Sequence, residues 1–203
     1  MSQIKLKHSG GNSVIIAAPD SNPASDRTLK LPSDADGTIL TTNSATGKIL
    51  QVVSTTKTDQ FSVTPSAAET AITGLTASIT PNSTSNKVLI TCHLSAIASN
   101  NVYTYFAFTR GGSKITAACG DAQGSRSQAM VGTFPYNDTD TMNNFYFHYL
   151  DSPSSTSALT YGVNYIRGST SSHTFYVNYG TVSSDVATRA TFSSTITAME
   201  VAA

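Results

Sequence analysis

The sequence contains no tryptophan, two cysteines and few charged residues. Lys, Arg, Asp and Glu together make up 12% of the chain, and the formal net charge is zero. A nucleic-acid-binding surface needs clustered Lys and Arg. Because the chain has no Lys/Arg run, we expect no nucleic-acid partner. Disorder usually accompanies high charge and few β-branched residues, and this composition has neither feature.

Long apolar runs are also missing. No stretch approaches the twenty apolar residues of a spanning helix, so we expect no membrane insertion. Residues 1–8 show no apolar signal core, which predicts synthesis in a cytoplasm. Two cysteines, Cys92 and Cys119, cannot form a disulfide framework, and Cys92 falls on an apolar strand face. We therefore expect both thiols to be reduced.

Strand patterns dominate the last sixty residues. Four β-prone runs, at 145–150, 159–166, 173–179 and 194–201, are separated by clusters of Ser, Gly, Pro and Asp. Large apolar residues alternate with smaller or polar ones, as in Phe145, Phe147 and Tyr149. A period of two places each set on one sheet face, so these rows are the predicted core.

Similar runs fill the chain from residue 49 onward, and none has a helical period. They lie at 49–53, 60–64, 71–79, 88–97, 102–110 and 129–133, with a hairpin signal, Arg-Gly-Gly-Ser, at 110–113. So many short strands without a helix predict an all-β fold. We expect residues 49–203 to form an antiparallel two-sheet jelly-roll sandwich.

Residues 1–48 have a different texture. Short β-prone pieces at 4–7, 14–17, 28–31 and 38–42 sit between tight turns. Each piece offers two or three apolar side chains, whereas ordering a residue costs roughly 1–2 kcal/mol. The segment therefore needs partners, and other copies of the same chain are the nearest supply, which predicts an interwoven oligomer.

Several short motifs resemble parts of known virus proteins. Residues 27–40, RTLKLPSDADGTIL, resemble the "TLxLP…dGTxL" segment at the start of many phage tail-fibre and virion-appendage proteins. Residues 79–89 (ITPNSTSNKVL), 150–153 (LDSP) and 196–200 (ITAME) resemble the C-terminal knobs of marine and cyanobacterial phage structural proteins. Those knobs are similar to the trimeric jelly rolls of the tumour necrosis factor and complement-collagen superfamily.

The resemblance implies a homotrimeric phage virion structural protein without enzymatic activity, made in the host cytoplasm. Residues 1–48 would be the virion-docking and intertwining segment, and residues 49–203 the jelly-roll knob. Two places remain open: a tail fibre that contacts the host surface, or a capsid decoration protein or head fibre. The expected partners are the chain itself, other capsid or tail proteins and a host cell-surface glycan. The apolar residues expected to dock are Ile4, Leu6, Val14, Ile16, Leu29 and Leu31.

A loop tyrosine is the leading candidate for glycan contact. Tyr136 lies beside Asn137, Asp138 and Asp140, and loop aromatics stack on sugar faces while Asn and Asp bind hydroxyls. A surface loop with one packed tyrosine is the competing interpretation. The Asx-rich stretch lacks the Gly and the distal Glu of a calcium loop.

Other polar residues leave several alternatives open. His93 and His148 lie mid-strand, either hydrogen-bonded in the interior or lining a threefold axis. Glu200 pairs with Arg167 or Arg189, lies near such an axis, or is exposed. No cofactor or metal is expected, and no nucleophile elbow, phosphate loop or zinc motif occurs. A free cytokine-type trimeric ligand and a small glycan-acting enzyme are the alternative functions.

Overall fold

The computed structural model describes residues 3–7, 9–11, 13–17, 49–99, 102–133, 142–168, 170–181, 185, 187 and 189–203. In the strands at 3–7 and 13–17 only the backbone is described. The chain divides into two compact units, residues 1–44 and 45–203. Apart from a 3-10 turn at Thr116–Ala118, every regular element in the described ranges is a β-strand.

The first unit contains a β-hairpin. Strands β1 (Gln3–Lys7) and β2 (Ser13–Ala17) are antiparallel, and Ile4 lies opposite Ile16 in their register. Gly11 adopts φ 97° in the connection, which glycine reaches without strain. Two of the four predicted short strands are therefore present, and those at 28–31 and 38–42 lie outside the described residues.

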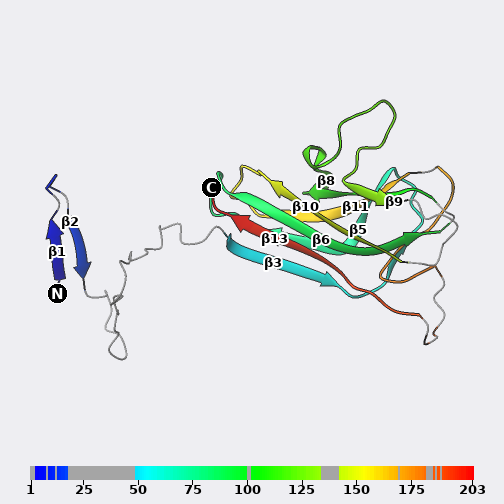
Figure 1. The fold of residues 1–203 in the computed structure, drawn as a ribbon, viewed down its shortest axis with the longest axis horizontal. Coiled ribbons are helices and arrows are strands. Elements are labelled where there is room, and N and C mark those ends of the chain that lie inside the picture. Colours follow the sequence, from blue (N-terminus) through cyan, green and yellow to red (C-terminus); the bar gives the residue numbers. More distant parts are fainter. Residues whose placement is uncertain are drawn as a thin grey trace. The chain divides into compact units, whose positions relative to one another are not determined.

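The second unit contains a six-stranded antiparallel sheet. Its members are β3 (Ile49–Lys57), β4 (Phe61–Val63), β6 (Lys87–Ala98), β10 (Asn143–Asp151), β12 (Phe175–Val177) and β13 (Ser194–Val201). β6 pairs with β10 on one edge and with β13 and β12 on the other, and β3 and β4 pair with β13 and β12. Figure 1 shows β3, β13 and β6 side by side in this sheet.

A five-stranded sheet completes the second unit. It runs in the order β5 (Glu69–Ile79), β11 (Leu159–Arg167), β7 (Thr104–Arg110), with β8 (Ser113–Lys114) and β9 (Val131–Thr133) both paired to β7. The predicted hairpin at 110–113 is confirmed: Arg110 pairs with Ser113, and Gly111 and Gly112 have φ 58° and 81°. Positive φ at both central residues is the requirement of a tight two-residue hairpin turn.

The core lies between the two sheets. Aromatic rings meet across it, with centroids 4.7 Å apart for Phe106 and Phe145 and 4.7 Å apart for Phe108 and Phe147. The predicted core rows are confirmed in most members: Phe145, Phe147, Tyr161, Val163, Tyr165, Phe175 and Val177 are buried, while Tyr149 and Leu159 are half-buried against them. The all-β, two-sheet antiparallel prediction is therefore confirmed as a β-sandwich.

One predicted strand is shorter than expected. The sequence predicts a strand over 173–179, whereas β12 ends at Val177. Asn178 has φ 67°, which leaves the extended region, and its fully buried side chain donates hydrogen bonds to the carbonyls of Lys57 (2.9 Å) and Asp59 (3.0 Å). Asn tolerates positive φ better than most residues. The chain therefore turns where Asn178 binds the end of β3.

Candidate functional site

Apolar side chains gather on the outer face of the six-stranded sheet. Among the described residues, six large hydrophobic side chains are exposed, and five of them belong to β3 and β10: Ile49, Leu50, Val52, Tyr146 and Leu150. The register aligns Val52, Met199, Leu89 and Leu150 in one row across β3, β13, β6 and β10. We call these four residues the apolar row.

Polar side chains continue this face beside the apolar row. The hydroxyls of Ser54 and Thr197 lie 2.8 Å apart, and the next pair toward β12, Thr56 and Thr195, is 3.0 Å apart. These hydroxyls bond to one another across β3 and β13, and neither pair carries a charge.

Both candidate histidines lie on this outer face. The His93 ring stacks on Tyr146 with centroids 4.5 Å apart and an interplanar angle of 12°, and its Nε2 is 3.4 Å from Asn144 Oδ1. His148 is exposed two residues from Tyr146. Within the described ranges, no group of three or more His, Cys, Asp or Glu side chains is placed to hold a metal ion.

Glu200 lies in the interior, which excludes the exposed alternative. Its side chain is 0% exposed and accepts hydrogen bonds from Asn86 Nδ2 (2.6 Å), Gln51 Nε2 (2.7 Å) and the Asn82 backbone N–H (2.7 Å). Burial acts to raise the pKa of Glu200, but these hydrogen bonds outweigh it and hold the pKa below its ordinary value. All three donors are neutral. Arg167 instead donates to the carbonyl of Pro65 at 3.0 Å.

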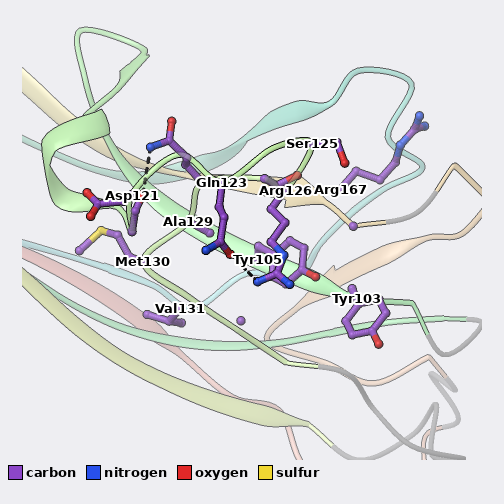
Figure 2. A pocket seen from close by; sticks show the side chains of 15 residues that line it. Tyr103, Tyr105, Asp121, Gln123, Ser125, Arg126, Ala129, Met130, Val131 and Arg167 are labelled. Atoms are coloured by element: carbon purple, nitrogen blue, oxygen red, sulfur yellow. Dashed lines mark hydrogen bonds between the residues drawn. The ribbon is translucent and has the colours of Figure 1, made fainter.

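A polar cavity opens against the outer side of β7 (Figure 2). Its volume is about 760 Å³, and it is bounded by Tyr103, Tyr105, β9 and the loop at 120–130. The Tyr103 and Tyr105 rings are nearly parallel, 6.0 Å apart at an angle of 20°. Tyr103 is 48% exposed and Tyr105 half-buried, so aromatic surface faces the cavity.

The loop that forms the wall of this cavity is closed on itself. Gly120 N–H donates to Ala129 O at 3.2 Å, and Gln128 Nε2 donates back to Gly120 O at 2.9 Å. Arg126 Nη1 donates to Gln123 Oε1 at 2.7 Å. Figure 2 shows Gln123 and Arg126 pointing from the loop into the cavity on the side of Tyr105.

The side chains predicted for glycan contact and docking lie outside the described part of the chain. Tyr136, Asn137, Asp138 and Asp140 lie outside the described residues. Ile4, Leu6, Val14 and Ile16 lie in β1 and β2, where only the backbone is described, and Leu29 and Leu31 are outside the described ranges.

Sequence reasoning missed the Tyr105 cavity. Residues 103–108 are apolar on both faces, which predicts a central strand covered on each side, and residues 117–128 are predicted to form a long loop. The structure leaves Tyr103 exposed and Tyr105 half-buried, so one face of this strand is only partly covered. Gly132 in β9 was the available signal, because a glycine in a strand often marks a close approach by another group; Gly168 directly follows β11. Their place beside Tyr105 is set by pairing between distant segments, which periodicity does not reveal.

No protein-family model and no curated protein sequence matches the chain. No helix in the described part is both long and apolar enough to cross a membrane.

Proposed function

We propose that this protein is a non-enzymatic, homotrimeric virion appendage. Residues 1–48 attach it to the particle, and residues 49–203 form a projecting jelly-roll knob. The proposal combines the resemblance of residues 27–40 to tail-fibre N-termini with the surface chemistry of the second unit.

The strand order supports the jelly-roll assignment. β10-β6-β13-β3 form one sheet and β5-β11-β7 with β9 the other, so the chain crosses between sheets from β4 to β5, β5 to β6, β6 to β7, β9 to β10, β10 to β11 and β11 to β12. Crossovers between two packed sheets, rather than hairpins within one sheet, are typical of the Greek keys of a jelly roll.

The apolar row is the single observation that carries the oligomer. An exposed apolar patch concentrated on one sheet face, bordered by paired hydroxyls, is typical of a surface that another protein covers. Burying it gains about 25 cal/mol per Å² of apolar area. A second and third copy of the same chain supply a matching surface, and the number three comes from the resemblance to trimeric knobs.

The mass of the full chain in solution tests this proposal. We expect a complex of three 21.3 kDa chains. Val52→Arg places a charge in the apolar row and is expected to shift the population to single chains. Ala71→Arg, at an exposed position of β5 in the other sheet, is the matched control and should leave the complex intact. A wild-type protein that remains a single chain at micromolar concentration contradicts the proposal.

A further inference from the structure

Two glycines let the Tyr105 ring lie close to the sheet. Gly132 lies directly opposite Tyr105 in the β7–β9 register. A Cβ added at Gly132 would overlap the Tyr105 ring, and one at Gly168 would come within 2.8 Å of Tyr105 Cε2. Neither glycine is among those with positive φ, so their backbone conformations do not require glycine. An added Cβ would also lie 2.6 Å from the Thr104 carbonyl oxygen at Gly132 and would overlap Tyr103 Cβ at Gly168, so the two glycines make room for the ring and for the chain at 103–104.

The resulting surface has the chemistry of a sugar platform. Two tyrosine rings offer partly exposed apolar faces together with hydroxyl groups, and such rings combine a large contact area with a polar end. The adjoining wall supplies planar polar groups: the Gln123 and Gln128 amides donate and accept hydrogen bonds, and the Asp121 carboxylate accepts them. The loop's internal hydrogen bonds hold this wall in place, which lowers the ordering cost of binding.

The charges in the cavity indicate the kind of sugar. The lining residues include two arginines, Arg126 and Arg167, and a single carboxylate, that of Asp121. The Arg167 guanidinium donates to the Pro65 carbonyl and points away from Arg126 in Figure 2, so Arg126 supplies the guanidinium on the side of Tyr105. The three ion pairs among the described residues do not involve Arg126, whose hydrogen-bond partner is the neutral Gln123. A guanidinium carries five N–H donors and binds carboxylates through two of them at once.

We propose that this cavity binds an acidic saccharide: a sugar ring packs on the Tyr103 and Tyr105 rings, and Arg126 binds its carboxylate. The volume of about 760 Å³ falls within the usual range of ligand sites and admits a short oligosaccharide. The inference rests on the adhesive role of the proposed appendage and supplies its ligand class.

Calorimetry with two matched probes tests the proposal. The acidic probe is a hyaluronan hexasaccharide, which alternates glucuronate and N-acetylglucosamine, and the neutral probe is an N-acetylglucosamine hexamer of equal length. We expect saturable binding of the acidic probe, about tenfold tighter than the neutral one, as one charge-assisted pair would give. Equal affinity for both probes, or no saturable binding of either at millimolar concentration, overturns the proposal.

Variants of the full chain assign the binding to this cavity. Arg126→Gln should abolish the preference for the acidic probe, whereas Lys87→Gln removes the same charge from an exposed position on β6 and should preserve it. Tyr105→Ala should abolish binding of both probes. Gly132→Ala should weaken both, because its Cβ displaces the ring. A preference unchanged in Arg126→Gln refutes the assignment.

Two further measurements separate the outcomes. Circular dichroism and mass measurements on the same samples identify any variant that has lost its fold or its trimer. Arg126 is exposed, so the Arg126→Gln variant then decides whether this cavity causes the preference for the acidic probe. A trimer that binds neither probe refutes this inference alone, and a single chain that binds the acidic probe refutes the trimer alone. Tighter binding of a thymidine hexanucleotide than of hyaluronan overturns the saccharide in favour of single-stranded nucleic acid.

Discussion

Individual polar residues in the sandwich interior are bonded to specific partners. Asp151 Oδ2 accepts from Arg110 Nη1 at 2.6 Å and from the Tyr161 hydroxyl at 2.7 Å. The buried His173 ring has Nδ1 2.8 Å from Ser171 O and Nε2 2.6 Å from the Tyr165 hydroxyl. An unpaired polar group in such a place costs about 1–3 kcal/mol. These residues therefore fix one arrangement of the strand ends.

Glu200 offers a direct measurement of this effect. Glu200→Gln places an amide N–H₂ where three donors now meet a carboxylate, so at least one donor loses its acceptor. We expect a loss of about 2 kcal/mol at neutral pH, or roughly 4–8 °C in melting temperature at fixed protein concentration. Glu69→Gln is the control, because Glu69 and its ion-pair partner Lys114 are both part-exposed and contribute at most about 1 kcal/mol.

The same carboxylate predicts the pH dependence of stability. The pKa of Glu200 lies below its ordinary value of 4.5 in the folded protein, so the unfolded chain takes up this proton at a higher pH. Stability from Glu200 is therefore complete above 4.5 and is lost as the pH falls through the folded pKa. Melting curves should show the wild type and Glu200→Gln converging as the pH falls below 4.5. A constant difference at every pH would contradict the assignment of Glu200 as an ionised acceptor.

Strand β5 contains a bulge at a glycine with positive φ. Residues 72–75 of β5 lie opposite Val163 alone in β11, so β5 bulges there. Gly74 has φ 82° in this bulge, and an added Cβ would lie 3.3 Å from the Nζ of buried Lys57. The bulge bends an edge strand and brings the Lys57 ammonium beneath it.

Three glycine substitutions should therefore rank in a fixed order. Gly74→Ala combines backbone strain with crowding against Lys57, and Gly112→Ala, with φ 81° and open space around it, has strain alone. Gly120→Ala has neither and serves as the control. We expect the free energy of unfolding to fall by more than about 1 kcal/mol in Gly74→Ala, by about 1 kcal/mol in Gly112→Ala and not at all in Gly120→Ala, as measured from melting temperatures. A Gly74→Ala protein as stable as Gly120→Ala would show that the bulge relaxes at no cost.

Strands were predictable from the sequence to the extent that one face of each is buried. Phe145 and Phe147 stand two positions apart, as do Tyr161 and Val163, because the opposite sheet covers that face of each strand. The strand end at Asn178 was not predictable, since its hydrogen bonds go to Lys57 and Asp59, more than a hundred residues away. The hydrogen-bond partners of Glu200 were not predictable for the same reason. Its donors come from β3 and from the loop before β6. A period of two indicates on which face of a strand a residue lies, but it does not identify the residue's partners.

The whole molecule consists of two units with separate hydrogen-bond ladders. β1 pairs with β2, and the described strands of residues 49–203 form their own two sheets. The core cluster among the described residues is drawn from the second unit alone, from Ile72 to Ala198. The virion proposal assigns different tasks to the two units, attachment to the first and trimer formation to the second.

Deletion of residues 1–48, which ends just before β3, tests this division. We expect the remaining chain to melt within about 2 °C of the full chain and to keep its trimer mass, because its core and the apolar row are intact. It should no longer cosediment with particles that lack the protein. Full chains carrying Leu6→Asp or Val14→Asp should lose particle binding in the same way, if the hairpin's apolar residues dock.

The full chain and the deletion variant also test where on the particle the protein lies. Cosedimentation of the full chain with empty capsids supports capsid decoration, whereas binding to host cells supports a tail fibre. The deletion separates these further: a host-contacting knob keeps its cell binding without residues 1–48, because the acidic-sugar cavity lies in the second unit. A deletion that still binds particles contradicts the docking role of residues 1–48. If the variant without residues 1–48 unfolds, the sandwich does not fold independently of the first unit, since its strands would then need the hairpin to bury their apolar faces.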